Sequence, residues 1–357
     1  MCGTGNPTAR PARGPAPLPA GPPYRNRTAR AVKFLGPREV AVSEVALAPP
    51  EDGEATIRTL YSGISTGSEL LAYRGRVDPG TALDETIGSL GGTFAYPFSY
   101  GYSCVGVVES SRCDVDEGAT VFAFHPHQDR FTAPARDLVL LPPSLPARTG
   151  VLLPMVETAL QIALDSGDVE AKTVVITGLG TVGIFTALIL AEAGASVIGS
   201  EPLGWRRRIA SELGVHAVAP SQLADRCSEV TGGRGAPLVI EASGKPAVLD
   251  DCLGLCAHEG TVLVASWYGT QPVRIDLGGR FHRRRLTLRS TQVSTIPASL
   301  SQRWTRSTRR EAALHLAGRL PLGHLATTEM PFEEAAAAYS MLDSSTEGVM
   351  HVTLRYQ

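Results

Sequence analysis

Residues 173–183 read Thr-Val-Val-Ile-Thr-Gly-Leu-Gly-Thr-Val-Gly, a β-branched run followed by three closely spaced glycines. The next residues, Ile184 to Ala193, are mostly apolar, so the pattern predicts a strand, a tight turn and a helix. A second short apolar run, Ser196 to Ser200, comes next and is followed by Glu201. Strand, helix, second strand and an acidic residue about 20 residues beyond the first glycine together indicate a dinucleotide-binding unit.

Each glycine of this segment has a separate physical role. Gly178 permits the sharp turn, Gly180 lets the backbone approach a pyrophosphate, and Gly183 lets the helix pack closely on the strand. Phosphates are favoured at the N-terminus of a helix. We therefore also expect Thr181 and Val182, which open this helix, to contact the cofactor.

The end of the second strand indicates which cofactor binds. Glu201 can accept hydrogen bonds from both hydroxyls of an adenosine ribose, and its charge repels a 2′-phosphate, so NAD(H) is expected in preference to NADP(H). Against this stand Arg206, Arg207 and Arg208, which would pair with a 2′-phosphate if their loop folded back over the site. The alternative is that they form a solvated helix face. Arg206 is kept as a candidate cofactor-binding residue.

Composition excludes several classes of partner. The chain has 357 residues, a formal net charge of -2 and 43% apolar residues, so it has no single-sign field that would attract nucleic acid or a membrane surface. Its longest mostly apolar run, residues 184–193, is far shorter than the roughly 20 residues of a membrane helix. The six cysteines are scattered without a disulfide framework or a signal peptide, which favours a soluble, cytoplasmic protein without disulfides.

The chain divides into segments of different character. Residues 1–30 are rich in proline, glycine, alanine and arginine and predict a disordered tail. Residues 31–155 contain short strands punctuated by glycine and proline, as in a β-rich, barrel-like domain. Residues 156–292 alternate strands and helices, which predicts a doubly wound parallel sheet, that is, an α/β fold. Residues 293–357 again look mixed and are expected to complete the first domain.

Several motifs give this layout a family resemblance. Residues 101–108, Gly-Tyr-Ser-Cys-Val-Gly-Val-Val, resemble the G-H-E-x-x-G-x-V segment of the medium-chain dehydrogenase/reductase superfamily. Residues 61–68, Tyr-Ser-Gly-Ile-Ser-Thr-Gly-Ser, resemble its G-I-C-x-x-D segment. Glu157-Thr-Ala-Leu resembles the segment that opens the superfamily's Rossmann domain, and residues 64–69 resemble the I-S-T-G-x-E pattern of bacteriochlorophyllide dehydrogenases.

The resemblance implies a fold and further site residues. It implies a GroES-like catalytic domain joined to a Rossmann domain, and a homodimer formed by edge pairing of Rossmann sheets. Thr158 matches a position that packs on the nicotinamide, and Ser266 lies in residues 265–269, where the family contacts the same ring. A small-molecule substrate is the expected partner, with no nucleic acid and no membrane.

The departures from the family concern zinc. At the positions of the cysteine and histidine ligands of the catalytic zinc the sequence has Ser65 and Tyr102, and Cys113 stands alone where the structural zinc lobe has four cysteines. Zinc requires thiolate, imidazole or carboxylate ligands, so we predict no metal and a zinc-independent branch. A displaced site made by Glu157, His125 and His127 is the alternative; the other interpretation of the two histidines is a polar bend near the cleft.

Without zinc, a hydrogen-bond donor must polarise the oxygen that gains charge during hydride transfer. Tyr102 is the candidate donor, Ser65 is a candidate proton relay, and Glu157 is a candidate base or substrate-orienting group. Alternatively, Tyr102 only fills the cavity left by the zinc, and Glu157 is a buried structural residue. The predicted function is an NAD(H)-dependent oxidoreductase that interconverts an alcohol and a ketone on a biosynthetic small molecule. An enoyl or quinone reductase, or an inactive nucleotide-binding protein, is the alternative.

Overall fold

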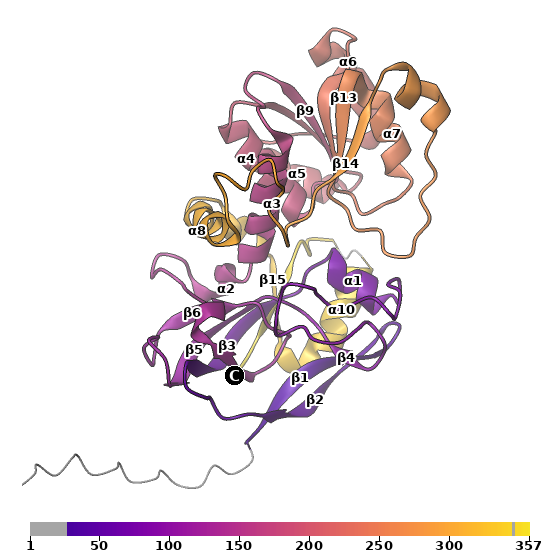
Figure 1. Cartoon of the computed structure of the whole chain (residues 1–357). Coiled ribbons are helices and arrows are strands. Elements are labelled where there is room, and N and C mark those ends of the chain that lie inside the picture. Colours follow the sequence, from indigo (N-terminus) through magenta and orange to yellow (C-terminus); the bar gives the residue numbers. More distant parts are fainter. Residues whose placement is uncertain (1–26, 345–346) are drawn as a thin grey trace, which may run out of the picture.

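The computed structural model describes residues 27–344 and 347–357, which form a β-rich part and an α/β part stacked end to end (Figure 1). Most of the tail predicted for residues 1–30 lies outside the described residues. Its last four residues require a correction, because β1 already begins at Arg27. The backbone of Arg27 to Arg30 pairs with residues 44–47 of β2, and this pairing outweighs the loop-like composition.

The β-rich part contains two sheets and corresponds to the GroES-like domain. One has the order β2-β1-β4 and the other β15-β16-β3-β5-β6-β8, with β7 paired to β3. Its N-terminal strands are β1 (Arg27–Gly36), β2 (Glu39–Leu47), β3 (Glu54–Gly63), β4 (Phe98–Ser99), β5 (Cys104–Ser111), β6 (Thr120–Ala123), β7 (Arg130–Pro134) and β8 (Leu138–Leu140). Helix α1 (Ser68–Tyr73) follows β3, and η1 (Ala135–Asp137) and α2 (Ala147–Gly150) flank β8.

The α/β part is a six-stranded sheet of order β11-β10-β9-β12-β13-β14, in which every neighbouring pair is parallel. This confirms the predicted doubly wound sheet. Its strands are β9 (Thr173–Thr177), β10 (Ser196–Ser200), β11 (His216–Val218), β12 (Ala236–Glu241), β13 (Cys256–Val264) and β14 (Thr287–Ser290). Its helices are α3 (Leu153–Ser166), α4 (Thr181–Glu192), α5 (Gly204–Glu212), α6 (Pro220–Thr231), α7 (Val248–Leu255) and the short η2 (Leu277–Phe281).

Alternate residues of the central strand bury opposite faces of this sheet. Val174 and Ile176 belong to the core shared with α3 and α4, whereas Val175 packs into the core beneath α6 and α7. Because side chains alternate along a strand, a β-branched run such as residues 173–177 is the composition expected of a strand covered on both faces.

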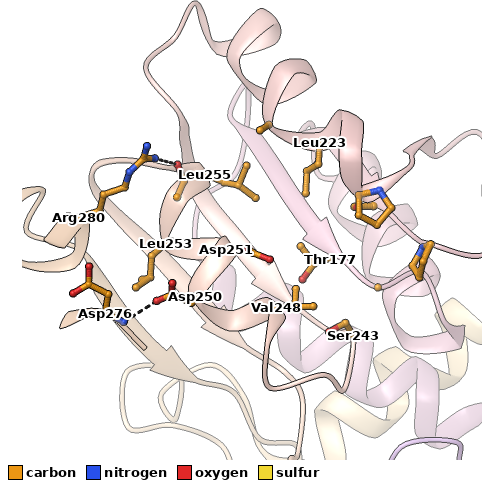
Figure 2. Close-up of a pocket in the computed structure, with 16 residues that line it drawn as sticks. Thr177, Leu223, Ser243, Val248, Asp250, Asp251, Leu253, Leu255, Asp276 and Arg280 are labelled. Atoms are coloured by element: carbon orange, nitrogen blue, oxygen red, sulfur yellow. Dashed lines mark hydrogen bonds between the residues drawn. The ribbon is translucent and has the colours of Figure 1, made fainter. Parts of the chain in front are cut away.

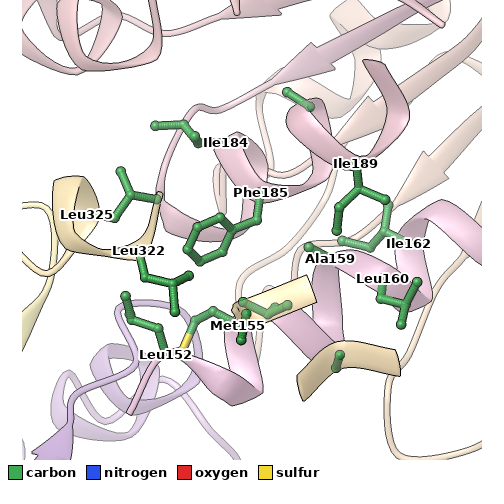
Figure 3. Close-up of a cluster of buried hydrophobic side chains, with 14 of the residues drawn as sticks. Leu152, Met155, Ala159, Leu160, Ile162, Ile184, Phe185, Ile189, Leu322 and Leu325 are labelled. Atoms are coloured by element: carbon green, nitrogen blue, oxygen red, sulfur yellow. The ribbon is translucent and has the colours of Figure 1, made fainter. Parts of the chain in front are cut away.

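The C-terminal segment links the two parts. It contains α8 (Arg306–Ala317), α9 (Leu322–Leu325), β15 (Thr328–Pro331), η3 (Phe332–Glu334), α10 (Ala335–Asp343) and β16 (Val352–Arg355). Strand β16 pairs with β3, so the chain end returns to the β-rich part. Leu322 and Leu325 of α9 join the same buried cluster as Phe185 of α4 and Met155 of α3 (Figure 3).

No helix within the described part of the chain is both long enough and apolar enough to cross a membrane.

Candidate active site

The glycine turn after β9 has the geometry of a phosphate cradle. Gly178 has a φ of 92°, and a Cβ on it would stand 2.5 Å from Cα of Ser243. A Cβ on Gly183 would overlap the carbonyl oxygen of Gly178, so helix and turn touch backbone to backbone. By contrast, a Cβ on Gly180 would have open space around it. The turn is therefore closely packed at Gly178 and Gly183 but open at Gly180, where the N-terminus of α4 presents its amides.

Thr181 and Val182 lie at this helix start. The hydroxyl of Thr181 is buried and has no hydrogen-bond partner among the described residues. A buried polar atom without a partner costs free energy, and here it lies in the first turn of α4 beside the open face of Gly180. The observation fits a bound phosphate oxygen at this point. Val182 is half-buried and packs against the core, which leaves its backbone as the group available to a ligand.

Glu201 is fixed by the turn that it follows. Its Oε2 accepts from the amide of Leu179 at 3.1 Å and its Oε1 from the amide of Leu203 at 3.0 Å, and the residue is only 3% exposed. Each carboxylate oxygen can accept a second hydrogen bond. The side chain therefore fits a ribose whose two hydroxyls donate to it.

The three arginines after Glu201 have different surroundings. Arg206 Nη1 lies 4.0 Å from Glu201 Oε2, its guanidinium lies over the Trp205 ring, and burial lowers its pKa. Arg207 donates to the carbonyl oxygens of Glu201 and Pro202. Arg208 is exposed, 3.6 Å from Glu347. Of the three, Arg206 is the one held beside the carboxylate of Glu201.

A cavity of about 640 Å³ opens beside this turn (Figure 2). Thr177, Gly178 and Ser200 from the strand ends, Ser243 after β12, and Leu223 and Val248 from the flanking helices contribute to its lining. It lies at the carboxyl ends of β9, β10 and β12, where the strand order reverses and open α/β sheets bind their ligands.

A second set of polar groups gathers at one edge of the β-rich sheet. Ser62, at the end of β3, pairs with Cys104, the first residue of β5, and Cys104 pairs with Ala123, the last residue of β6. Ser65 and Tyr102, which flank these strands, therefore leave the sheet at the same edge.

The hydroxyls of Tyr102, Ser68 and Ser65 form a chain. Tyr102 Oη lies 2.8 Å from Ser68 Oγ, and Ser68 Oγ lies 3.5 Å from Ser65 Oγ. Burial, with the nearby charge of Glu69, raises the pKa of Tyr102 to about 12. The phenol is therefore protonated near neutral pH and able to donate a hydrogen bond.

Glu69 holds the loop that carries Ser65. It is fully buried, and its carboxylate accepts from the amide of Ser65 at 2.8 Å, from His127 Nε2 at 2.9 Å and from the Tyr339 hydroxyl. His127 Nδ1 in turn lies 2.7 Å from Ser62 Oγ. A Cβ on Gly101, whose φ is 104°, would stand 2.5 Å from the His127 ring, so glycine is required there.

The displaced metal site considered for His125, His127 and Glu157 is not supported. His127 is bound to Glu69, while His125 stacks on Phe131 with ring centroids 3.9 Å apart, and burial lowers its pKa to about 4. Glu157 is paired with arginines, its Oε1 3.0 Å from Arg309 Nη2 and its Oε2 3.5 Å from Arg310 Nε. The three side chains have separate partners because the fold points them into different cores.

Thr158 and Ser266 are placed by backbone contacts. Thr158 Oγ1 donates to the carbonyl oxygen of Pro154, and Ser266 Oγ accepts from the amide of Gly244. Glu241, at the end of β12, is buried and accepts from the amide of Ser243 at 2.8 Å and from the Tyr268 hydroxyl at 2.5 Å. The loop after β13 is thus tied to the loop after β12.

The same loop after β13 also touches the β-rich part. The amide of Thr270 donates to the carbonyl oxygen of Arg76 at 2.9 Å, and a Cβ on Gly269 would overlap that oxygen. The exposed Trp267 lies against Phe94, with ring centroids 6.0 Å apart.

Comparison with known proteins shows which dehydrogenases the chain is similar to. Residues 181–310 match the family model described as zinc-binding dehydrogenase. The chain is 28% identical over 334 residues to 2-desacetyl-2-hydroxyethyl bacteriochlorophyllide A dehydrogenase of Cereibacter sphaeroides, covering 87% of this chain and 93% of that protein. It is 25% identical over 344 residues to 2-dehydro-3-deoxy-L-galactonate 5-dehydrogenase of Pseudoalteromonas atlantica, covering 89% and 96%.

The fold agrees with these matches. The rspB dehydrogenase of Escherichia coli, solved with NADH, superposes with a TM-score of 0.73 at 17% identity, covering 92% of this chain and 99% of that one. These matches relate the protein to the zinc-type alcohol dehydrogenase-like superfamily of medium-chain dehydrogenases/reductases. It is a nicotinamide-dependent oxidoreductase whose homologues act as alcohol and polyol dehydrogenases.

Catalytic zinc, which the superfamily implies, does not fit the residues that this member has at the site. Ser65 and Tyr102 offer neutral hydroxyls, the second with a pKa raised to about 12, and the carboxylate of Glu157 is paired with two guanidinium groups. Zinc binds thiolate, imidazole or free carboxylate. Among the residues that the structure describes, no group of three or more His, Cys, Asp or Glu side chains is arranged to hold a metal ion.

Sequence reasoning about this dehydrogenase assigned no role to Glu69, Glu241, Arg309 or Arg310. Glu69 is part of the family pattern of residues 64–69. Its position four residues after Ser65, in the first turn of a helix, is the one sequence feature that indicates a hydrogen bond back to the Ser65 loop. Arg309 and Arg310 gave no signal, because their partner Glu157 lies about 150 residues earlier.

Proposed function

We propose that this dehydrogenase interconverts an alcohol and a ketone on a biosynthetic small molecule, with NAD(H) as cofactor and without a catalytic zinc. The observation that carries the proposal is the 2.8 Å contact between Tyr102 Oη and Ser68 Oγ, at the sheet edge where zinc-dependent relatives hold their metal ligands. A protonated phenol in that position is the donor that the reaction requires in place of a Lewis acid.

The nicotinamide, when bound, supplies or accepts the hydride. In the direction of ketone reduction, the Tyr102 hydroxyl donates a hydrogen bond to the carbonyl oxygen and then gives up its proton as negative charge develops there. Ser68 returns a proton to Tyr102 and takes one from Ser65, which is reprotonated by solvent, so the hydroxyl chain carries a proton from solvent to the reacting oxygen. Its high pKa keeps Tyr102 protonated until the oxygen can take the proton.

Glu201 supports NAD(H) as the cofactor. Its carboxylate lies at the end of β10 with free lone pairs for ribose hydroxyls, and its charge opposes a 2′-phosphate at the same place. Arg206 stays within 4.0 Å of that carboxylate, which partly offsets the charge. The exposed ring of Trp267, which lies against the buried Phe94, supports a bulky or cyclic substrate.

The test follows the hydride. NADH deuterated at C4 is incubated with cyclic ketones, aldehydes and enones, and the deuterium is located by mass spectrometry and NMR. Label on a carbinol carbon supports the proposal. Label on the carbon β to a carbonyl indicates an enoyl or quinone reductase instead, and no transfer with intact NADH binding indicates an inactive nucleotide-binding protein.

Tyr102→Phe isolates the donor. We expect turnover to fall by about 10²-fold or more while the affinity for NADH stays unchanged, because the phenol lies away from the glycine turn. Tyr61→Phe, which removes another half-buried phenol from the end of β3, is the matched control and should retain turnover. Full activity in Tyr102→Phe would remove this residue from the mechanism.

A further inference from the structure

We propose that the guanidinium of Arg310 binds a carboxylate carried by the substrate, so that the enzyme acts on keto acids and hydroxy acids or on larger molecules with an acid side arm. The inference rests on the proposed function for its site and deepens it by naming the substrate class. It is carried by the partners, charge and position of Arg310.

Two arginines lie beside the single carboxylate of Glu157, so there is one more positive charge than negative in this group of three side chains. Arg309 is 1% exposed and donates to Glu157 Oε1 from Nε at 3.2 Å and from Nη2 at 3.0 Å. Its remaining donors reach Gln161 Oε1 at 2.5 Å and the carbonyl oxygens of Val293 and Thr295. Arg309 therefore neutralises Glu157 inside the protein with every nitrogen in use. Arg310 therefore brings a second positive charge to a carboxylate that Arg309 already neutralises.

Arg310 has donors to spare. Its Nε lies 3.5 Å from Glu157 Oε2 but makes no hydrogen bond, and neither Nη atom donates to any group in residues 27–344 or 347–357. The side chain is 30% exposed, while its Nε is buried beside Glu157. A guanidinium matches the two oxygens of a carboxylate with two parallel hydrogen bonds. One unbalanced charge suits a singly charged carboxylate better than a dianionic phosphate.

The position of Arg310 relates these donors to the hydroxyl chain. Its guanidinium carbon lies 4.7 Å from the centre of the Phe124 ring. Phe124 follows Ala123, the last residue of β6, and Tyr102 lies two residues before Cys104, the first residue of β5, which pairs with Ala123. Phe124 and Tyr102 thus leave the same sheet edge, and α8 carries Arg310 there from the junction of the two parts (Figure 1). Phe124 packs against the core of the α/β part and Tyr102 against that of the β-rich part, so the proposed substrate extends from Tyr102 across this junction to place its carboxylate on Arg310.

The experiment compares two probes that differ in charge and in one methyl group. The dissociation constants of 4-oxocyclohexanecarboxylate and its methyl ester are measured by calorimetry, with the protein free and saturated with NAD⁺, so that binding is observed without turnover. We expect the acid to bind at least about tenfold more tightly than the ester, as for a charge-assisted contact worth roughly 1.4 kcal/mol. Higher salt should reduce this ratio.

The variants assign the effect to one side chain. Arg310→Gln should bring the acid-to-ester ratio close to one without changing the affinity for the ester, and Arg310→Lys should restore part of it. Arg306→Gln removes an exposed arginine from the same helix and should keep the wild-type ratio. Equal binding of acid and ester by the wild type, or a loss in Arg310→Gln that affects both probes alike, would overturn the proposal.

Deuteride transfer to the same two probes separates this inference from the function on which it rests. A preserved acid preference without transfer to the carbinol carbon would refute the alcohol/ketone function and leave the carboxylate site standing. Transfer to both probes at equal efficiency and affinity would support the function and refute the site.

Discussion

The Nε2 atom of His127 lies 2.9 Å from Oε2 of Glu69, and neither side chain is exposed to solvent. Through its other contacts Glu69 joins the loop of Ser65 to Tyr339 of α10, a residue from the far end of the chain. The geometry of the hydroxyl chain therefore depends on a carboxylate that does not belong to it.

Glu69→Ala tests this dependence. Three buried donors would lose their acceptor, so we expect the free energy of unfolding to fall by about 3 kcal/mol or more. Urea denaturation measures the loss. Glu44→Ala, at an exposed position of β2, should change it by less than about 0.5 kcal/mol, and an equally small change in Glu69→Ala would show that the buried carboxylate is dispensable.

The glycines of the turn should separate folding from cofactor binding. Gly180→Ala has room for its methyl group in the protein alone, so its melting temperature should stay near wild type while NADH affinity falls about tenfold or more, a loss of roughly 1.4 kcal/mol. Gly183→Ala meets backbone and should lower both. Fluorescence titration with NADH and thermal unfolding give the two readouts. Unchanged NADH affinity in Gly180→Ala would contradict a phosphate at that position.

Glu201→Ala should shift the choice of cofactor. Loss of the carboxylate removes the acceptor for the ribose hydroxyls and the repulsion of a 2′-phosphate, so we expect NADH affinity to fall by about tenfold while NADPH affinity stays level or rises. Competition titrations measure both. Glu212→Ala, on the exposed end of α5, serves as the control, and a parallel loss for both cofactors would argue against this role of Glu201.

His351 predicts an acid-sensitive stability. It is 1% exposed, and burial lowers its pKa from 6.5 to about 3. Below pH 6.5 the unfolded chain takes up a proton at this histidine and the folded protein does not, so its contribution is present above pH 6.5 and is lost as pH falls toward 3. The slope reaches about 1.4 kcal/mol per pH unit. His351→Leu should flatten the decline between pH 6 and 4, whereas His258→Leu, at an exposed position, should leave it unchanged.

Strand β14 gives a test of self-association. It is one of the two outer strands of the six-stranded sheet, and its four residues are exposed, Leu288 among them. An open edge strand is a site for pairing with another chain, and we propose that two copies join here. Light scattering should give a dimer for the wild type and a monomer for Leu288→Lys. Leu140→Lys, on the exposed edge strand β8, should remain dimeric.

Much of the fold was predictable because it depends on short-range patterns. The β-branched run before Gly178 and the apolar residues after Gly183 specify a buried strand and its helix within about a dozen residues, and the parallel sheet follows. The fates of His125, His127 and Glu157 were not predictable in this way. His127 and Glu157 bind Glu69 and Arg309, which lie far away in the sequence, and His125 stacks on Phe131. Residue spacing does not specify which of these side chains will meet in the fold.

The start of β1 shows the same limit on a smaller scale. Arg27 to Arg30 continue a composition that favours a loop. Their backbone nevertheless pairs with residues 44–47, and main-chain hydrogen bonds of this kind do not depend on the side chains. Local preference is therefore least informative where partners distant in sequence hold a strand.

The contact between Thr270 and Arg76 has a mechanical consequence. It joins the two parts main chain to main chain, and Gly269 admits no side chain that could hold them apart. Separation of the two parts at this loop would break that hydrogen bond and move Trp267 away from Phe94. The loop therefore fixes the distance between the two parts at this point.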